Sequence, residues 1–319
     1  MVQVITDSCA SIPAKLTQQL NIEVVPYYIH RVASQIGWSL PQVPNLREVK
    51  QRLLNRDETE TAERPAPVVE TLRDLVDVKR KEFFDWLPQA EQLPKTANPG
   101  PGDYLAAFRK VAEKAKEIVT IHMTSKGSGA YQSALAAKEM AKETLPDLNI
   151  EVVDTLQVAM VHGWATIEAA RAALEGLSLE QVAGVARRVA GNGMMIQTAD
   201  TLRYLYKGGR IGRAQHLMGS LLRIKPLIGM EDGIIVALGQ ARSRAKAYLQ
   251  MAELMSRRVK PGDRIKAAFT HVAAMGEAER LREIVCSRFD CVETLTTELS
   301  PALGVHTGPG TVGVCFYVT

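Results

Sequence analysis

The sequence predicts an α/β protein made of two domains, and three observations support this fold class. Short apolar strands alternate with helices from residue 2 to about residue 155, which is typical of a mostly parallel sheet with helices on both faces. After residue 157 the order changes to two long helices, a hairpin and two further helix–strand pairs, which favours a mixed sheet covered by helices, mainly on one face. A chain of 319 residues is also longer than one ordinary domain. We therefore expect a three-layer domain over residues 1–156 and a second α/β domain over residues 157–319.

The elements of the first domain follow from short apolar segments and the polar turns between them. Residues 2–6 are expected to form a buried strand, and Asp7, Ser8 and Pro13 after it favour a turn into a helix. The other expected elements are helices over residues 15–20, 102–116 and 129–143 and strands over residues 22–29, 117–123 and 148–153.

Residues 31–94 interrupt this alternation. Residues 45–54 and 68–87 have helical periodicity, and a charged stretch with Pro65 and Pro67 separates them. We predict a helical insertion here, which is either a surface elaboration without chemistry or a lid or partner surface.

The second domain begins with a long Ala-rich helix over residues 158–174. Ser178 and Gln181 then form a capping box that opens the next helix. Residues 231–233, Glu-Asp-Gly, indicate a hairpin turn between two apolar strands. The remaining expected elements are helices over residues 214–222, 243–258 and 277–288 and strands over residues 194–197, 225–228, 234–238, 264–272, 292–299 and 311–318.

The composition excludes several classes of function. Hydrophobic residues make up 46% of the chain, charged residues 23%, and the net charge is only +4, without a basic stripe interleaved with aromatics. Mild positive charge is therefore the only feature that favours the hypothesis of a nucleic-acid-binding regulator, and we expect no nucleic acid partner. The four cysteines are dispersed without zinc spacing, so we expect reduced thiols and no metal. No signal peptide or membrane-length apolar run is visible, which predicts a cytoplasmic protein without an integral membrane segment.

The first candidate binding loop covers residues 124–132. It connects an apolar strand to a helix, and the amides at a helix N-terminus attract an anion. Ser125 and Ser128 add hydroxyl donors, while Gly127 and Gly129 let the backbone approach a ligand closely. An ordinary helix cap is the alternative, and the Gly-Ser-Gly arrangement favours a ligand.

The second loop places Thr96 before residues 97–102, in which two prolines and two glycines make a stiff turn. Such a turn either only connects two elements or holds a side chain for a ligand. The third loop is expected between extended segments, with His306 followed by Gly308 and Gly310. Residues 308–313 fit Gly-x-Gly-x-x-Gly, but a strand and not a helix follows them, so we reject a dinucleotide site. His306 is either a structural hydrogen-bonding residue or a donor to a carboxylate or phosphate in a cleft.

Two further possibilities concern the same residues. The turn at residues 207–211, which contains Arg210, is either a plain surface turn or a site for phosphate or a protein partner. Ser128 and His306 could also act as nucleophile and base in an acyl-transfer enzyme or hydrolase, although Ser128 lacks the Gly-x-Ser-x-Gly context.

An ordered set of short motifs closely resembles the DegV family and spans nearly the whole chain. The motifs are residues 7–8, 95–99, 125–134, 153–155, 207–211 and 306–310. The resemblance implies two α/β domains with a long-chain fatty acid between them and no cofactor. It also implies a carrier rather than an enzyme, similar to the fatty-acid-binding subunit that presents its ligand to a separate bacterial fatty acid kinase.

Carried over by motif, the resemblance implies that Thr96, Ser128 and His306 bind the fatty acid carboxylate and that Arg210 belongs to the turn that engages the kinase. The chain departs from the family pattern at three places. Residues 96–99 read Thr-Ala-Asn-Pro where the family has Thr-Ser-Gln-Pro, residues 128–131 read Ser-Gly-Ala-Tyr where it has Ser-Gly-Thr-Tyr, and residues 31–94 are longer than usual.

Overall fold

The computed structural model describes residues 1–32, 69–220 and 224–319. The helix predicted for residues 45–54 lies outside the described residues, as do residues 221 and 222 of the helix predicted for residues 214–222.

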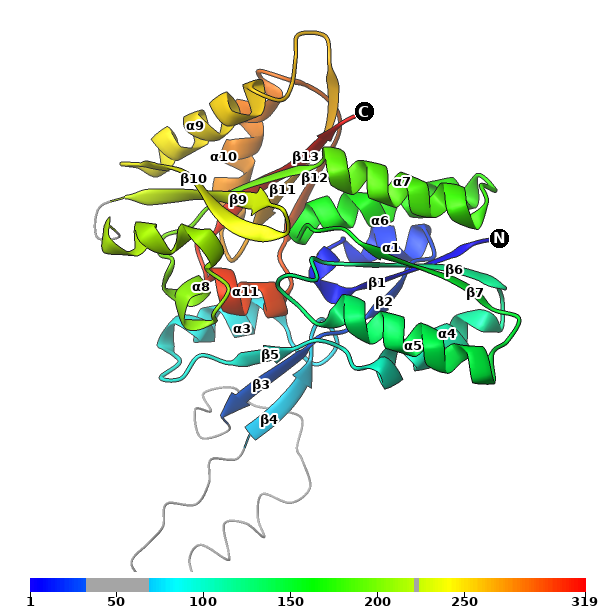
Figure 1. The fold of residues 1–319 in the computed structure, drawn as a ribbon. Coiled ribbons are helices and arrows are strands. Elements are labelled where there is room, and N and C mark those ends of the chain that lie inside the picture. The colour runs from blue at the N-terminus through cyan, green and yellow to red at the C-terminus, as the bar shows by residue number, and fades with distance from the viewer. Residues whose placement is uncertain (33–68, 221–223) are drawn as a thin grey trace, which may run out of the picture.

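The first sheet is parallel throughout, as the alternation predicted. Its strand order is β2 (Glu23–Val25), β1 (Gln3–Asp7), β6 (Glu117–His122) and β7 (Asn149–Asp154). Helices α4 (Pro101–Ala112) and α5 (Ala130–Thr144) lie on one side of it, and α6 (Ala159–Leu174) and α7 (Leu179–Asn192) lie on the other (Figure 1). The carboxyl ends of the four parallel strands therefore meet at one edge, where ligands of open α/β sheets bind.

The single strand predicted over residues 22–29 is wrong, because it is two strands in two sheets. Strand β2 ends before Pro26, which has no N–H to continue the ladder. The chain then enters β3 (Tyr28–Val32), the centre of an antiparallel sheet with the order β4–β3–β5.

The helix predicted over residues 68–87 is also wrong in its first part. Residues 69–73 form β4 (Val69–Arg73), and only α3 (Arg80–Trp86), continued by the short η3 (Leu87–Gln89), is helical. Strand β4 pairs along its whole length with β3, so tertiary pairing overrides the local helical periodicity. Strand β5 (Lys95–Ala97) completes this small sheet, so the described part of the insertion is not purely helical.

The second sheet is mixed, as predicted. Its strand order is β10 (Ile234–Ala241), β9 (Lys225–Glu231), β8 (Met194–Thr198), β13 (Val312–Val318), β11 (Arg264–His271) and β12 (Asp290–Glu298). Only β11 and β12 are parallel neighbours. The predicted hairpin turn is confirmed at Asp232 and Gly233, whose φ angles of 49° and 78° match a two-residue turn with both central residues left-handed.

Helices cover both faces of this sheet, so the expectation of helices mainly on one face is wrong. Phe269 and Phe316 face a core made with α9 (Arg244–Ser256) and α10 (Met275–Cys286), whereas Ala268 and Cys315 face the core that contains α6. Because successive strand residues point to opposite faces, the two groups lie on opposite sides of the sheet.

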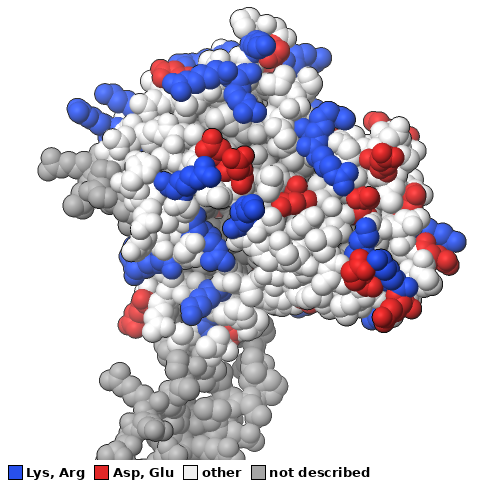
Figure 2. Space-filling model, viewed as in Figure 1, with Lys and Arg blue, Asp and Glu red and all other residues white. Residues whose placement is uncertain are grey.

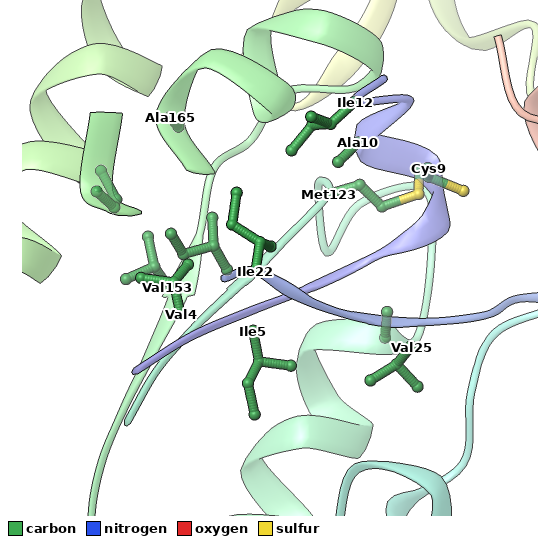
Figure 3. Close-up of a cluster of buried hydrophobic side chains, with 14 of the residues drawn as sticks. Val4, Ile5, Cys9, Ala10, Ile12, Ile22, Val25, Met123, Val153 and Ala165 are labelled. Carbon is green, nitrogen blue, oxygen red and sulfur yellow. The ribbon is translucent and has the colours of Figure 1, made fainter. Parts of the chain in front are cut away.

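Helix α6 is the centre of the molecule because it packs between the two large sheets. It contacts β1 and β6 of the first sheet and β13, β11 and β8 of the second. A helix with sheets on two sides must be small and apolar almost all round, which explains its run of alanines and the full burial of Trp164. Figure 3 shows part of this core, where Val4 of β1 lies beside Val153 and Met123 lies beside Cys9. The domain boundary at residues 156 and 157 stays a prediction.

The predicted capping box of α7 is confirmed. The backbone N–H of Gln181 donates to the Ser178 hydroxyl, and the Ser178 N–H donates to the Gln181 amide oxygen. The described part of the predicted helix over residues 214–222 belongs to a 3-10 segment, η4 (Gly212–Ser220). Four short helices complete the described chain: η1 (Ser8–Ala10), α1 (Ala14–Gln19), α8 (Arg203–Lys207) and α11 (Pro301–Thr307).

Candidate functional site

A cavity of about 210 Å³ lies where the first sheet, the small sheet and the second sheet meet. One ordered water needs about 10–15 Å³ on such a measure, so the cavity has room for an extended molecule. Apolar side chains from η1, β8, α8, β9, β10 and α11, together with the residue after β6 and the residue before α6, form much of its wall. These are Cys9, Met123, Val158, Met195, Leu205, Ile228, Met230, Ile234, Ile235, Ala302 and Leu303.

The sequence offers two apolar segments as walls for a ligand, the helix that begins at residue 158 and residues 217–222, and they line this cavity only in part. Val158, at the start of α6, lines the cavity. Leu217 does not, and residues 221 and 222 lie outside the described residues.

Thr96, Ser128 and His306 all line this cavity, although 210 residues separate the first from the last. Thr96 comes from β5 and His306 from α11, and the Thr96 Oγ1 and His306 Nε2 atoms form a hydrogen bond of 2.8 Å. Ser128 comes from the loop between β6 and α5. The structure therefore brings the three predicted polar residues to one cavity.

His306 is held by a helix and not by a loop, which corrects the expectation for residues 306–310. Helix α11 begins at Pro301, and the Leu303 N–H donates to the Ser300 hydroxyl at its cap. It ends at Gly308, whose φ of 79° suits glycine. The insertion supports this helix, since a Cβ on Gly304 would lie 2.2 Å from a ring carbon of buried Phe84.

The imidazole of His306 is neutral at physiological pH. Burial, helped by the nearby positive charge of Arg210, lowers the pKa of His306 to about 4. Its Nδ1 atom is buried and has no hydrogen-bond partner among the described residues. Because Nδ1 is enclosed beside Gly208, the neutral ring contacts the Thr96 hydroxyl through Nε2 and adds no charge to the cavity.

Tyr27 completes the polar end of the cavity, and sequence reasoning missed it. Its hydroxyl lies 2.5 Å from the Ser128 hydroxyl, and burial raises its pKa well above the usual value, so the phenol stays protonated. Tyr27 directly follows Pro26 at the carboxyl end of β2, and a search of the carboxyl strand ends could have found it. The Ser128 hydroxyl also accepts the Ala130 N–H at the start of α5, which supports the helix-cap alternative, and a ligand role for Ser128 stays a prediction.

The other predicted residues of the binding loops divide into those that line the cavity and those that do not. Gly127 and Gly129 line the cavity, and a Cβ on Gly129 would lie 2.9 Å from the Asn98 side-chain oxygen. Ser125, Gly308 and Gly310 do not line it. The Ser125 N–H donates to Asp154, and Gly308 makes room for the ring of Tyr204.

Arg210, the residue predicted to engage a partner, is also part of the cavity wall. It lines the cavity, its Nε donates to the Gly127 carbonyl at 3.2 Å, and its Nη1 donates to the Gly208 carbonyl at 2.9 Å. On the face seen in Figure 2, Lys and Arg side chains gather near α8 and the β9–β10 turn, with Asp and Glu side chains beside them. The turn at residues 207–211 is thus part of both the cavity wall and the surface.

Comparison with known proteins identifies the family. The model of a family described as uncharacterised proteins, the DegV family, matches residues 70–319. The chain belongs to the DegV family. A DegV domain-containing protein of Clostridium perfringens is 28% identical over 315 residues, which cover 99% of this chain and 98% of the relative. Another from Clostridium acetobutylicum is 32% identical over 241 residues, covering 76% and 84% of the two chains.

A solved structure agrees with this family and with the observed fold. A DegV family protein from Thermus thermophilus, whose structure concerns its fatty acid binding, superposes with a TM-score of 0.82. The two sequences are 27% identical, and the match covers 100% of this chain and 99% of the other. The DegV fold predicted from the ordered motifs is thereby confirmed.

The arrangement in this DegV protein does not match a serine nucleophile and its base. His306 Nε2 contacts Thr96 and not Ser128, and no acidic group among the described residues orients the His306 Nδ1 atom. An acyl-transfer site needs a chain of nucleophile, base and orienting group, which these contacts do not form.

No helix within residues 1–32, 69–220 and 224–319 is both long and apolar enough to span a membrane. Over the same ranges, no three His, Cys, Asp or Glu side chains are grouped so as to hold a metal ion.

Proposed function

We propose that this protein binds a long-chain fatty acid in the cavity, with Thr96, Ser128 and His306 holding its carboxylate. The observation that carries the proposal is the composition of one cavity, which has an apolar wall and a group of neutral hydrogen-bond donors. Fatty acid binding by the DegV protein of Thermus thermophilus supports the same conclusion.

The two parts of such a ligand need these two parts of the cavity. Each buried methylene contributes about 0.8 kcal/mol, so the acyl chain supplies most of the affinity. A buried carboxylate without hydrogen bonds is costly, and hydroxyl groups such as those of Thr96, Ser128 and Tyr27 can satisfy it with charge-assisted bonds. Neutral His306 can donate one more through its Nε2 atom, which also contacts Thr96.

Native mass spectrometry of the purified protein tests this proposal. We expect an adduct with the mass of a long-chain fatty acid, and we expect the delipidated protein to bind an added fatty acid with one-to-one stoichiometry. Heat-unfolded protein is the control for non-specific adsorption. A delipidated, folded protein that takes up no fatty acid would contradict the proposal.

We further propose that the protein presents its fatty acid to a separate, ATP-using fatty acid kinase in the cytoplasm, which forms the acyl phosphate. Arg210 is the candidate docking residue, because its turn connects the cavity to the surface. Catalysis then belongs to the kinase, and this protein acts as a carrier.

Replacing Arg210 by Ala should lower the rate of acyl phosphate formation with a purified bacterial fatty acid kinase by about tenfold, since Arg residues at interfaces often supply 1 kcal/mol or more. Because Arg210 also contacts Gly127, we expect a smaller loss of fatty acid affinity in the same variant. The matched control is Arg213→Ala, which removes an exposed arginine of η4 that pairs with Glu231 and does not line the cavity. Equal losses of binding and phosphorylation in the Arg210 variant would remove the docking role.

A further inference from the structure

Gln197 is a polar side chain that the carboxylate-binding group does not use. It lies on β8, is only 3% exposed and lines the cavity. Its neighbours on the same wall are Met195 of β8 and Ile228 and Met230 of β9. The amide therefore stands in an otherwise apolar part of the cavity wall.

The amide of Gln197 makes no hydrogen bond to another described residue, and its oxygen and nitrogen are not among the fully enclosed polar atoms, so the amide faces the open cavity. Its strand neighbour on the other side is Gly313 of β13, where a Cβ would lie 2.4 Å from the Gln197 Cγ atom. Glycine at this position leaves room for the long side chain against the sheet. The sheet thus has room for a glutamine at this position. An apolar side chain here would avoid the cost of removing a polar group from water.

Water can satisfy this amide while the cavity is open, but a ligand that fills the cavity displaces the water, and an amide left without a partner is then costly. The carboxylate of the ligand cannot serve, because Thr96, Ser128 and His306 hold it on β5, the β6–α5 loop and α11. The partner must come from another part of the ligand. An amide both donates and accepts, so it suits a hydroxyl group in either direction and a keto oxygen as donor.

We propose that the natural ligand is a fatty acid whose chain bears a hydroxyl or keto oxygen, and that Gln197 recognises this oxygen. The inference rests on the proposed fatty acid function and adds the chemical class of the chain. Gln197 is then a specificity-determining residue, and the other wall residues contribute apolar burial only.

Binding of octadecanoic acid and of its monohydroxy derivatives to the delipidated protein tests the inference. The series should differ only in the carbon that bears the hydroxyl. We expect one position to bind about 5- to 30-fold more tightly than octadecanoic acid, the range for one satisfied buried hydrogen bond. In Gln197→Met, which keeps the length of the side chain without its amide, this preference should disappear.

Met195→Leu is the matched control, since it changes an apolar wall residue of the same strand and should shift both affinities equally. If every hydroxy acid binds no better than octadecanoic acid, or if Gln197→Met improves binding of octadecanoic acid while leaving the preference intact, the inference is overturned and an ordered water satisfies the amide. If neither class of acid binds, the proposed function itself fails, and the two failures are thus distinguishable.

Discussion

The double variant Thr96→Val, Ser128→Ala should bind fatty acid at least about a hundredfold more weakly than the native protein, because each lost hydrogen bond to a charged group costs roughly 1.5–3 kcal/mol. Both side chains line the cavity, and their removal leaves the carboxylate with fewer neutral donors. Isothermal titration calorimetry of delipidated protein measures the change.

Ser125→Ala is the control for this double variant. Ser125 lies in the same loop as Ser128 but does not line the cavity, so its affinity for fatty acid should equal that of the native protein. Circular dichroism should report an unchanged fold for all three proteins. A double variant that retains native affinity would mean that the carboxylate lies elsewhere.

Trp164→Ala should lower the free energy of unfolding by about 3–5 kcal/mol, the usual cost of removing a buried aromatic side chain. Trp164 is fully buried in α6, its indole N–H donates to the Cys315 carbonyl at 3.2 Å, and its ring lies 6.0 Å from that of Tyr317. Removing the indole would leave a new void between the two large sheets, and neither sheet can move alone to fill it. Equilibrium unfolding in urea measures the change.

A second tryptophan provides the comparison. Trp86 of α3 is only partly buried and packs against Phe83 and Arg31. Trp86→Ala should therefore destabilise the protein less than Trp164→Ala. The opposite order would show that α6 does not hold the two sheets together.

Elements with a strong local pattern were predicted well. The alternation over residues 2–155 led to the parallel sheet, the Asp232–Gly233 turn to the β9–β10 hairpin, and the Ser178–Gln181 pair to the start of α7. In each of these, the side chains that specify the element lie within a few residues of one another, so a single sequence contains the information.

The wrong predictions concern elements whose structure depends on contacts with residues far away in the sequence. The periodicity of residues 68–87 is helical, but β3 offers a strand partner for residues 69–73. A break at Pro26 was overlooked, so one strand was predicted for two. The faces of the second sheet were misjudged because α6 belongs to the cores of both sheets, which no local pattern reveals.

Local chemistry was enough to single out the small polar loops, and the order of the motifs was enough to indicate the DegV family. Which of these residues share a cavity was decided by packing. Thr96, Ser128 and His306 meet because β5, the β6–α5 loop and α11 converge, while Ser125, Gly308 and Gly310 point to other contacts. Tyr27 and Gln197 carry no motif, and only the tertiary structure places them at this cavity, because the packing of the sheets brings the end of β2 and strand β8 to the same wall.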